Sequence, residues 1–243
     1  MRDYLLDLVE HTYDLGCIEL IKITGTDKET TIDGLATDKS VVLQAKFATP
    51  VADFIGTFGM PNLGKLKILL NLQEYKEDAQ ITVINQNRNG VDAPVGLHFE
   101  NKTGDFKNDY RFMVSEVVAE QLKQFKMKPV PWAVEFEPTV ASIQRLKMQA
   151  QANAEEVNFT AKTDNGDLKF SFGDHSTHSG NFVFHPGVSG TLKRAWAWPI
   201  STVISILDLT GDKTFKISDD GAAMITVDSG LAVYNYILPA QSK

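Results

Sequence analysis

Three histidines and an aspartate in the stretch GDHSTHSGNFVFH have the side chains that bind metal ions: Asp174, His175, His178 and His185. Imidazole and carboxylate groups are the ligands that a zinc hydrolase would use. Their spacing matches none of the familiar metal-binding motifs, and the stretch lies between two predicted strands. We therefore interpret it as a solvated loop and predict no metal and no cofactor.

The sequence also lacks the motifs of nucleophilic and phosphate chemistry. It has no nucleophile elbow, no GxxxxGK loop and no GxGxxG after a strand, and GVSG at 187–190 has the wrong spacing. Cys17, the single cysteine, follows a predicted helix and is more typical of a small buried residue than of a nucleophile. It cannot form an internal disulfide, so the fold does not require an oxidising compartment. We predict that the protein is not an enzyme.

The elements that would position any site begin with four predicted amphipathic helices. They cover 4–15, 61–72, 139–152 and, started by Pro199, the stretch 198–209. Apolar residues at helical spacing predict which side chains of the first three face a core: Leu5, Leu8, Val9 and Thr12; Leu63, Leu66, Leu69 and Leu70; Val140, Ile143, Leu146 and Ala150.

Strand-like runs separated by turn residues fill most of the remaining chain. In the first half they cover 17–26, 29–37, 41–47, 79–86, 94–102 and 109–114. In the second half they cover 156–163, 167–174, 180–187, 190–198, 214–220, 222–230 and 231–239.

The two halves repeat one order: helix, strands, helix, strands. Pro61 opens the second helix and Pro199 opens the fourth, and the separation between these two prolines defines a repeat offset. Leu5 and Ile143, in the first and third helices, are separated by the same repeat offset. A constant offset at two landmarks predicts an internal duplication. The expected fold class is α+β, with two similar domains that each pack two helices on one face of antiparallel sheets.

The stretch 117–138 separates the halves and contains Pro129, Pro131 and Pro138. Proline removes a backbone donor and disfavours helix before it, so this stretch is expected to run extended. The predicted organisation is a first domain at 1–123, a connector at 124–134 and a second domain at 135–243.

The composition is that of a soluble globular protein, with 43 % hydrophobic and 23 % charged residues. The longest apolar run, 195–207, is interrupted by Pro199 and is too short to span a bilayer, so we expect a cytosolic protein without a membrane partner. The net charge of −7 argues against tight nucleic-acid binding, although the distribution of charge matters more than its sum.

Three phrases, in the context of the duplication, resemble the processivity sliding clamps of DNA replication. KPVPWAV at 128–134 resembles the connector of clamps from tailed phages, YNYILPAQSK at 234–243 resembles the end of the eukaryotic clamp, and 204–230 resembles the last helix and hairpin of clamp domains. The resemblance spans nearly the whole chain. It is closest to the tailed-phage branch of this family, which is related in fold to proliferating cell nuclear antigen (PCNA).

The resemblance implies a homotrimeric ring whose helices line a hole around duplex DNA. Such a ring is placed on DNA by a clamp loader and tethers the replicative polymerase, in the host cytoplasm if the protein is viral. The residues expected to face DNA are Lys65, Lys67, Arg145, Lys147, Lys193 and Arg194. The first helix departs from this pattern because it carries an acidic stripe, which would repel phosphate if it faced the hole. This stripe would instead face away from the hole or pair with a neighbouring lysine. The stripe comprises Asp3, Asp7, Glu10 and Asp14.

The resemblance also implies an apolar pocket for partner peptides under the connector. The matching positions are Leu43, Trp132, Tyr236, Ile237 and Pro239. Trp132 is either a wall of this pocket or a pin that holds the connector on the sheet. Tyr236 and Ile237 alternate on a strand, so at most one of them is expected to face the pocket.

Two rival functions remain open. One is a two-domain β-rich enzyme or phage structural protein with a metal site at the His175–His185 loop. The other is a single-stranded DNA binder that uses the aromatic and basic residues of KRAWAW at 193–198. Alternation along one strand followed by Pro199 favours core packing for those aromatics.

Overall fold

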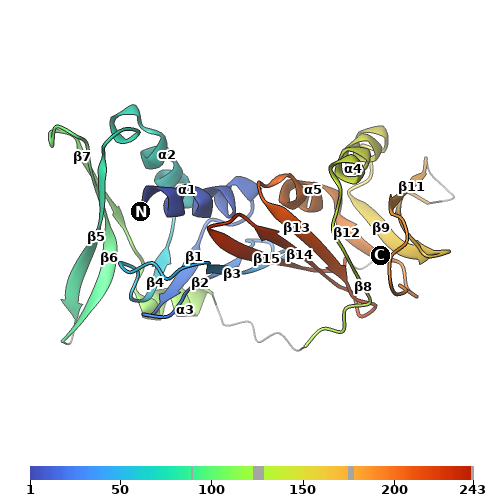
Figure 1. Cartoon of the computed structure of the whole chain (residues 1–243), viewed down its shortest axis with the longest axis horizontal. Coiled ribbons are helices and arrows are strands. Elements are labelled where there is room, and N and C mark those ends of the chain that lie inside the picture. Colours follow the sequence, from blue (N-terminus) through green and yellow to red (C-terminus); the bar gives the residue numbers. More distant parts are fainter. Residues whose placement is uncertain (89, 123–128, 175–177, 242–243) are drawn as a thin grey trace. The chain divides into compact units, whose positions relative to one another are not determined.

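The computed structural model describes residues 1–88, 90–122, 129–174 and 178–241 (Figure 1). The chain divides into two compact units. Unit 1 comprises Met1–Phe125 and Ser229–Tyr234, and unit 2 comprises Lys126–Asp228 and Asn235–Lys243.

In unit 1, helices α1 (Arg2–Glu10) and α2 (Leu63–Asn71) pack against each other. Strands β4-β1-β2-β3-β15 are consecutive neighbours in one sheet, and the beginning of β15 belongs to unit 1. A second antiparallel sheet has the order β5-β6-β7. The bounds are β1 (Ile21–Gly25), β2 (Thr30–Leu35), β3 (Val42–Phe47), β4 (Gly56–Met60), β5 (Gln80–Arg88), β6 (Val91–Glu100), β7 (Lys107–Arg111) and β15 (Ala232–Pro239).

The core of unit 1 follows the predicted helical stripes. Leu5, Leu8, Val9 and Thr12 are buried, as are the four leucines predicted for α2. Burying each leucine contributes roughly 1.5–3 kcal/mol before entropy is subtracted. Arg2 closes the C-terminal end of α2, because its Nη2 donates to the carbonyl oxygen of Leu70 at 2.6 Å and its Nε to that of Tyr75 at 3.2 Å.

In unit 2, helices α4 (Val140–Ala152) and α5 (Ile200–Asp208) form the corresponding pair. Thr139 and Ser142 form a capping box that starts α4, and Pro199 is the extended residue that precedes α5. One sheet has the order β11-β10-β9-β12, and β15-β14-β13-β8 are neighbours in another. The bounds are β8 (Val134–Phe136), β9 (Asn158–Asp164), β10 (Asp167–Phe172), β11 (Gly180–His185), β12 (Trp196–Pro199), β13 (Asp212–Ile217) and β14 (Ala222–Asp228).

The duplication extends to individual strand pairs. Phe58 lies opposite Ile23 in unit 1, and Trp196 lies opposite Ala161 in unit 2, so both members of the pair are separated by the repeat offset. Gly59, which forms a bridge to Met113, corresponds in the same way to Ala197, which forms a bridge to Gln241. The order β4-β1-β2-β3 is matched by β12-β9-β10-β11. The predicted α+β class with two similar units is confirmed.

The structure corrects several details of the expected elements. The first helix ends at Glu10, and a 3₁₀ turn follows at Tyr13–Leu15. The Thr12 hydroxyl donates to the Leu8 carbonyl at 2.6 Å and so competes with the backbone hydrogen bond that would continue the helix. Strand β4 was not predicted. Helix α3 (Ser115–Gln121) occupies the beginning of the stretch expected to run extended.

The predicted core stripe of the third helix is wrong at its start. Val140 is 77 % exposed, whereas Ile143 and Leu146 are buried. Ser142 is buried in its place, because the capping box turns the Ser142 side chain back onto Thr139.

Candidate functional site

The two lysines of α2 have different surroundings. Lys65 is exposed, and its backbone N–H donates to the Asn62 cap. Lys67 forms an ion pair with Asp14, with 2.7 Å between Nζ and Oδ1, and its Nζ lies 5.9 Å from the centre of the Tyr13 ring. Lys65 is therefore the cation of α2 that is directed to solvent without this acidic partner.

Helix α4 repeats this division in unit 2. The guanidinium of Arg145 is exposed and lies 5.3 Å from the centre of the Phe182 ring. Lys147 forms an ion pair with Asp208 of α5, with 2.5 Å between Nζ and Oδ1. Lys193 and Arg194 are exposed immediately before β12.

The acidic stripe of α1 does not form one exposed face. Asp7 is largely buried and accepts a hydrogen bond from the Tyr234 hydroxyl at 2.7 Å. Its Oδ1 lies 3.4 Å from Nδ1 of His11, whose ring stacks on Tyr234 with 4.5 Å between centroids. Asp14 is paired with Lys67, so two of the four acids have structural partners within unit 1.

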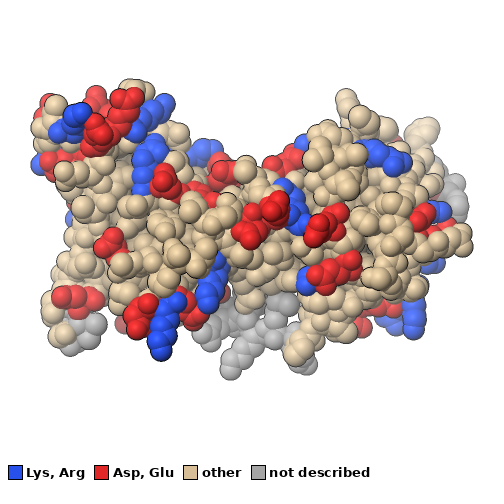
Figure 2. Space-filling model, in the orientation of Figure 1, with Lys and Arg blue, Asp and Glu red and all other residues tan. Residues whose placement is uncertain are grey.

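The helix pairs carry little net charge. Helix α1 contains one arginine and three carboxylates, and α2 contains two lysines, so the net charge of the pair is zero. Helices α4 and α5 together contain one arginine, one lysine and the carboxylate of Asp208, so their net charge is one positive charge. Figure 2 shows basic and acidic side chains interspersed on the viewed face of each unit. The helix surfaces therefore support weak rather than strong attraction for a polyanion.

The residues predicted for the partner pocket differ in exposure. Leu43 in unit 1 and Tyr236 in unit 2 have no exposed surface, and Ile237 is 8 % exposed. Trp132 is half-buried and Pro239 is exposed, so these two offer surface to a partner. The Pro239–Gln241 tail is held by the N–H of Ala240, which donates to Gly221 at 2.9 Å, and by the bridge between Gln241 and Ala197.

The histidine stretch is described only in part, because His175 lies outside the described residues. His185 packs against Phe136 with 5.0 Å between ring centroids, and its buried Nδ1 has no hydrogen-bond partner among the described residues. Within the described ranges, no group of three or more His, Cys, Asp or Glu residues could hold a metal ion. Burial, with a smaller contribution from Asp38, raises the pKa of the Cys17 thiol to about 11, which disfavours the reactive thiolate.

Sequence reasoning missed the contacts that join these elements. The partners of Lys67 and Lys147 are Asp14 and Asp208, which lie on different helical segments and far beyond the reach of any local pattern. The bond between Asp7 and Tyr234 joins the first helix to the last strand of the chain. The helical i,i+4 spacing from Asp7 to His11 was the one local signal for this cluster.

Comparison with known proteins identifies the fold. No protein-family model and no curated protein matches the sequence. Two solved structures match nearly the whole chain at 9 % identity. A PCNA of A. fulgidus bound to the C-terminal region of FEN-1 matches with a TM-score of 0.71 over 98 % of this chain and 96 % of that one. PCNA from Thermococcus kodakaraensis matches with a TM-score of 0.66 over 99 % and 97 %.

The protein has the α+β fold of a PCNA-like clamp, in which both units of this chain take part. In the described part of the chain, no helix is both long and apolar enough to cross a membrane.

Proposed function

We propose that this protein is the subunit of a homotrimeric sliding clamp that encircles duplex DNA and tethers the replicative polymerase after a clamp loader places it. The observation that carries the proposal is the match of a two-unit chain to PCNA over nearly its full length. The connector phrase at 128–134 supports an assignment to the tailed-phage branch.

The strand edges support ring formation. Among the described strands, β7 is one end of the sheet β5-β6-β7 and β11 is one end of the sheet β11-β10-β9-β12, so each has an edge that could pair with another strand. Pairing of β7 in one copy with β11 in the next would be a head-to-tail contact, which closes into a ring when the rotation fits.

The charges of the helices support a clamp that stays on DNA by encircling it and not by tight binding. Lys65 and Arg145 would approach phosphate, while Lys67 and Lys147 are held by carboxylates. Because few cations are free to bind phosphate, DNA that is not encircled would bind weakly. The same weak attraction would let the ring slide along a duplex that it encircles. Partner peptides would bind near Trp132 and Pro239.

The experiment combines mass in solution with primer extension. Light scattering should give three times the chain mass of 26.9 kDa, as expected for a closed ring of three copies. Processivity of the partner polymerase, with its loader, should rise on a closed circular template and not on a short linear duplex. Equal stimulation on both templates, or a firm monomer at high concentration, would overturn the proposal.

Matched variants locate the surfaces in the same assay. Reversing the charge of Lys65 and Arg145 together should reduce stimulation, whereas reversal of the exposed Lys28 and Lys162 should not. Replacing Trp132 and Pro239 by alanine should reduce stimulation while the mass in solution stays that of the trimer. Full stimulation by either test variant would contradict the location proposed for the corresponding surface.

A further inference from the structure

Strand β5 has an edge that no other strand of the described chain covers. It is one end of the sheet β5-β6-β7, and its register pairs it with β6. Edge strands are usually protected by charged residues or by proline, because an unprotected edge can pair with another chain. The stretch QITVINQN at 80–87 contains neither, and half of its residues are β-branched. The edge of β5 is therefore open to the addition of a strand.

The duplication identifies the strand of unit 2 that corresponds to β5. In unit 1 the N–H of Phe112 donates to the Val95 carbonyl at 2.9 Å. In unit 2 the N–H of Ala240 donates to the Gly221 carbonyl at 2.9 Å. Val95 and Gly221 are therefore corresponding anchor positions, so β6 corresponds to β14 and β5 corresponds to β13.

The strand registers extend this correspondence to single residues. Ile81 lies opposite the β6 residue four positions after its anchor, and Phe215 lies opposite the β14 residue four positions after its anchor. Val83 and Ile217 lie opposite the residues two positions after the anchors. Ile81 therefore corresponds to Phe215, and Val83 corresponds to Ile217.

In unit 2 the corresponding edge is covered by β8. Phe136 and Val134 of β8 lie opposite Phe215 and Ile217 of β13. The N–H of Ala133 donates to the Ile217 carbonyl at 2.9 Å. Under this cover Phe215 and Ile217 have no exposed surface. Unit 2 therefore shows the kind of segment that fits this edge, which is a short extended strand with apolar residues two positions apart.

The described residues of unit 1 place no strand there, and the side chains of β5 show the difference. Ile81 and Val83 are half-buried, and Thr82 between them is exposed. In unit 2 the residue at this middle position is Lys216, whose Nζ lies 2.9 Å from Oε1 of Glu135 in β8. The strand that covers unit 2 thus presents a carboxylate to a lysine, whereas a strand added to β5 meets an uncharged threonine.

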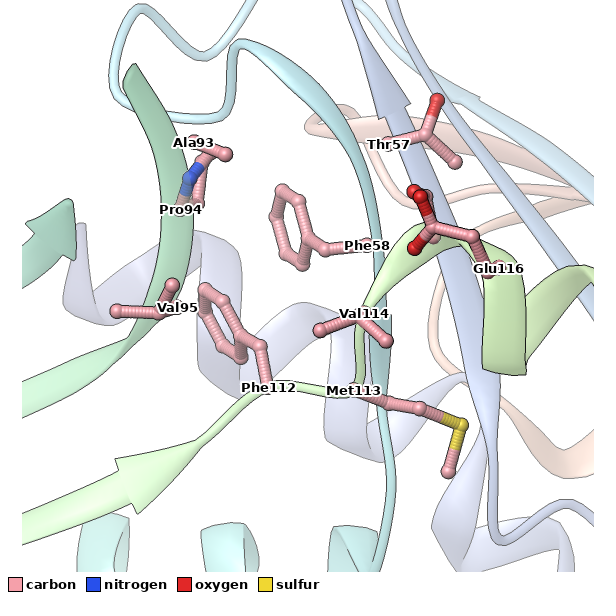
Figure 3. A pocket seen from close by; sticks show the side chains of 10 residues that line it. Thr57, Phe58, Ala93, Pro94, Val95, Phe112, Met113, Val114 and Glu116 are labelled. Carbon is pink, nitrogen blue, oxygen red and sulfur yellow. The ribbon is translucent and has the colours of Figure 1, made fainter. Parts of the chain in front are cut away.

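The cavity of unit 1 is separate from this edge. It has a volume of about 210 Å³ and lies beside Phe58 and Phe112, between β4 and the start of β6 (Figure 3). None of its described lining residues belongs to β5. Substitutions in this cavity therefore serve as controls for binding at the edge.

We propose that the open edge of β5 binds an extended segment of a partner protein, which adds to the sheet β5-β6-β7 as β8 adds to β13. The segment places apolar side chains opposite Ile81 and Val83 and a small uncharged polar side chain opposite Thr82. Backbone hydrogen bonds, including one to the Val83 carbonyl, supply affinity, and the alternating side chains supply specificity. The site uses neither DNA nor the surface of Trp132 and Pro239, so it goes beyond the proposed clamp function.

The direct test is fluorescence anisotropy of the full-length protein, without DNA, and a dye-labelled, end-capped peptide. The peptide VPWAVTFEP copies residues 130–138 with threonine in place of Glu135. Saturable binding is expected. An N-methyl group on the alanine nitrogen of the peptide removes the donor to the Val83 carbonyl and should weaken binding at least about fivefold. No saturable binding up to about 1 mM, or equal binding of the methylated peptide, would overturn the proposal.

Variants of the edge place the peptide on β5. Val83→Pro removes a backbone donor from the edge, and Ile81→Lys puts a charge where the added strand packs, so each should weaken binding at least about tenfold. Ile81→Lys serves if Val83→Pro fails to fold. Thr57→Leu, which alters the cavity beside Phe58, is the control and should bind like the unaltered protein. Unchanged binding by a folded edge variant would overturn the location.

A charge exchange tests the register of the added strand. Thr82→Lys copies Lys216 of unit 2 and should strengthen binding of the natural sequence VPWAVEFEP about two- to fivefold. Gln86→Lys, at an exposed position further along the same strand, is the matched control and should not strengthen it. Equal strengthening by both lysines would contradict the proposed register.

Light scattering distinguishes a partner protein from a second copy of this chain. No mass above that of the trimer is expected. A mass that doubles with concentration, and returns to that of the trimer in the Val83→Pro variant, would assign the edge to a second copy and overturn the proposal. Because the peptide assays contain no DNA, their failure would leave the clamp proposal standing, and a monomeric protein that binds VPWAVTFEP would leave this inference standing.

Discussion

The same helical position has opposite surroundings in the two units. Asp7 in α1 and Arg145 in α4 are separated by the repeat offset. Asp7 is largely buried and bonded to Tyr234, whereas Arg145 is exposed beside the Phe182 ring. The units thus share backbone register without sharing side-chain chemistry, so a surface assigned in one unit cannot be transferred to the other.

The largest expected effect on stability comes from truncating core residues at corresponding positions of the two units. Trp198 and Met60 are fully buried and occupy corresponding positions in β12 and β4. Trp198→Ala should lower the free energy of unfolding by about 3–5 kcal/mol, and Met60→Ala by about 2–5 kcal/mol, because each leaves a cavity.

Urea unfolding followed by circular dichroism measures both losses. Val157→Ala, at a 75 % exposed position, is the control and should change stability by less than about 0.5 kcal/mol. A loss below about 1 kcal/mol at either core position would break the correspondence between the strands.

An intermediate effect sharpens the contrast between Asp7 and Arg145. Asp7→Ala should cost about 1–3 kcal/mol, because the buried Tyr234 hydroxyl loses its carboxylate acceptor. Arg145→Ala should stay within about 0.5 kcal/mol, as expected for an exposed side chain. The same urea titration measures both, and equal losses would contradict the contrast.

The smallest effect concerns pH. The hydrogen bond between His98 Nδ1 and Asp109, at 2.8 Å, raises the pKa of His98, with a further contribution from Glu100. The raised pKa stabilises unit 1 fully below the unfolded pKa of about 6.5, and this stabilisation is lost as pH rises through the folded pKa. Because the His98 side chain is 33 % exposed, the contribution should be below about 1 kcal/mol.

Unit 2 supplies the matched variant for this prediction. The N–H of Phe112 donates to the Val95 carbonyl, as the N–H of Ala240 donates to the Gly221 carbonyl, so Val95 and Gly221 correspond. His98 and Met224 lie three positions after them, and His98→Met therefore copies unit 2. This variant should lose the decline in stability above about pH 6.5. An NMR titration that places the His98 pKa at or below about 6.5 would refute the assignment.

The helices and the repeat were predictable because their signals are local and periodic. Leucines at helical spacing define α2, and the two proline landmarks define the offset. Strand β4 was missed because GTFGM has glycines and little alternation, and the structure forms it through pairing with β1. Helix α3 was missed because the prolines that follow it dominated the interpretation of 117–138.

The candidate surfaces were less predictable than the fold. Exposure of Lys65 and Arg145 followed from helical spacing, but the ion pairs of Lys67 and Lys147 depend on which helices become neighbours. Such features arise from tertiary packing, which one sequence does not encode in short-range patterns.

Strand β15 has a consequence for dissecting the protein. Its first residues, through Tyr234, belong to unit 1, and the rest belongs to unit 2. A gene cut at the connector would therefore yield a first fragment without Tyr234, the side chain that bonds Asp7 and stacks on His11. The duplicated halves are therefore not interchangeable modules, and recombination at the midpoint would separate unit 1 from the part of β15 that belongs to it.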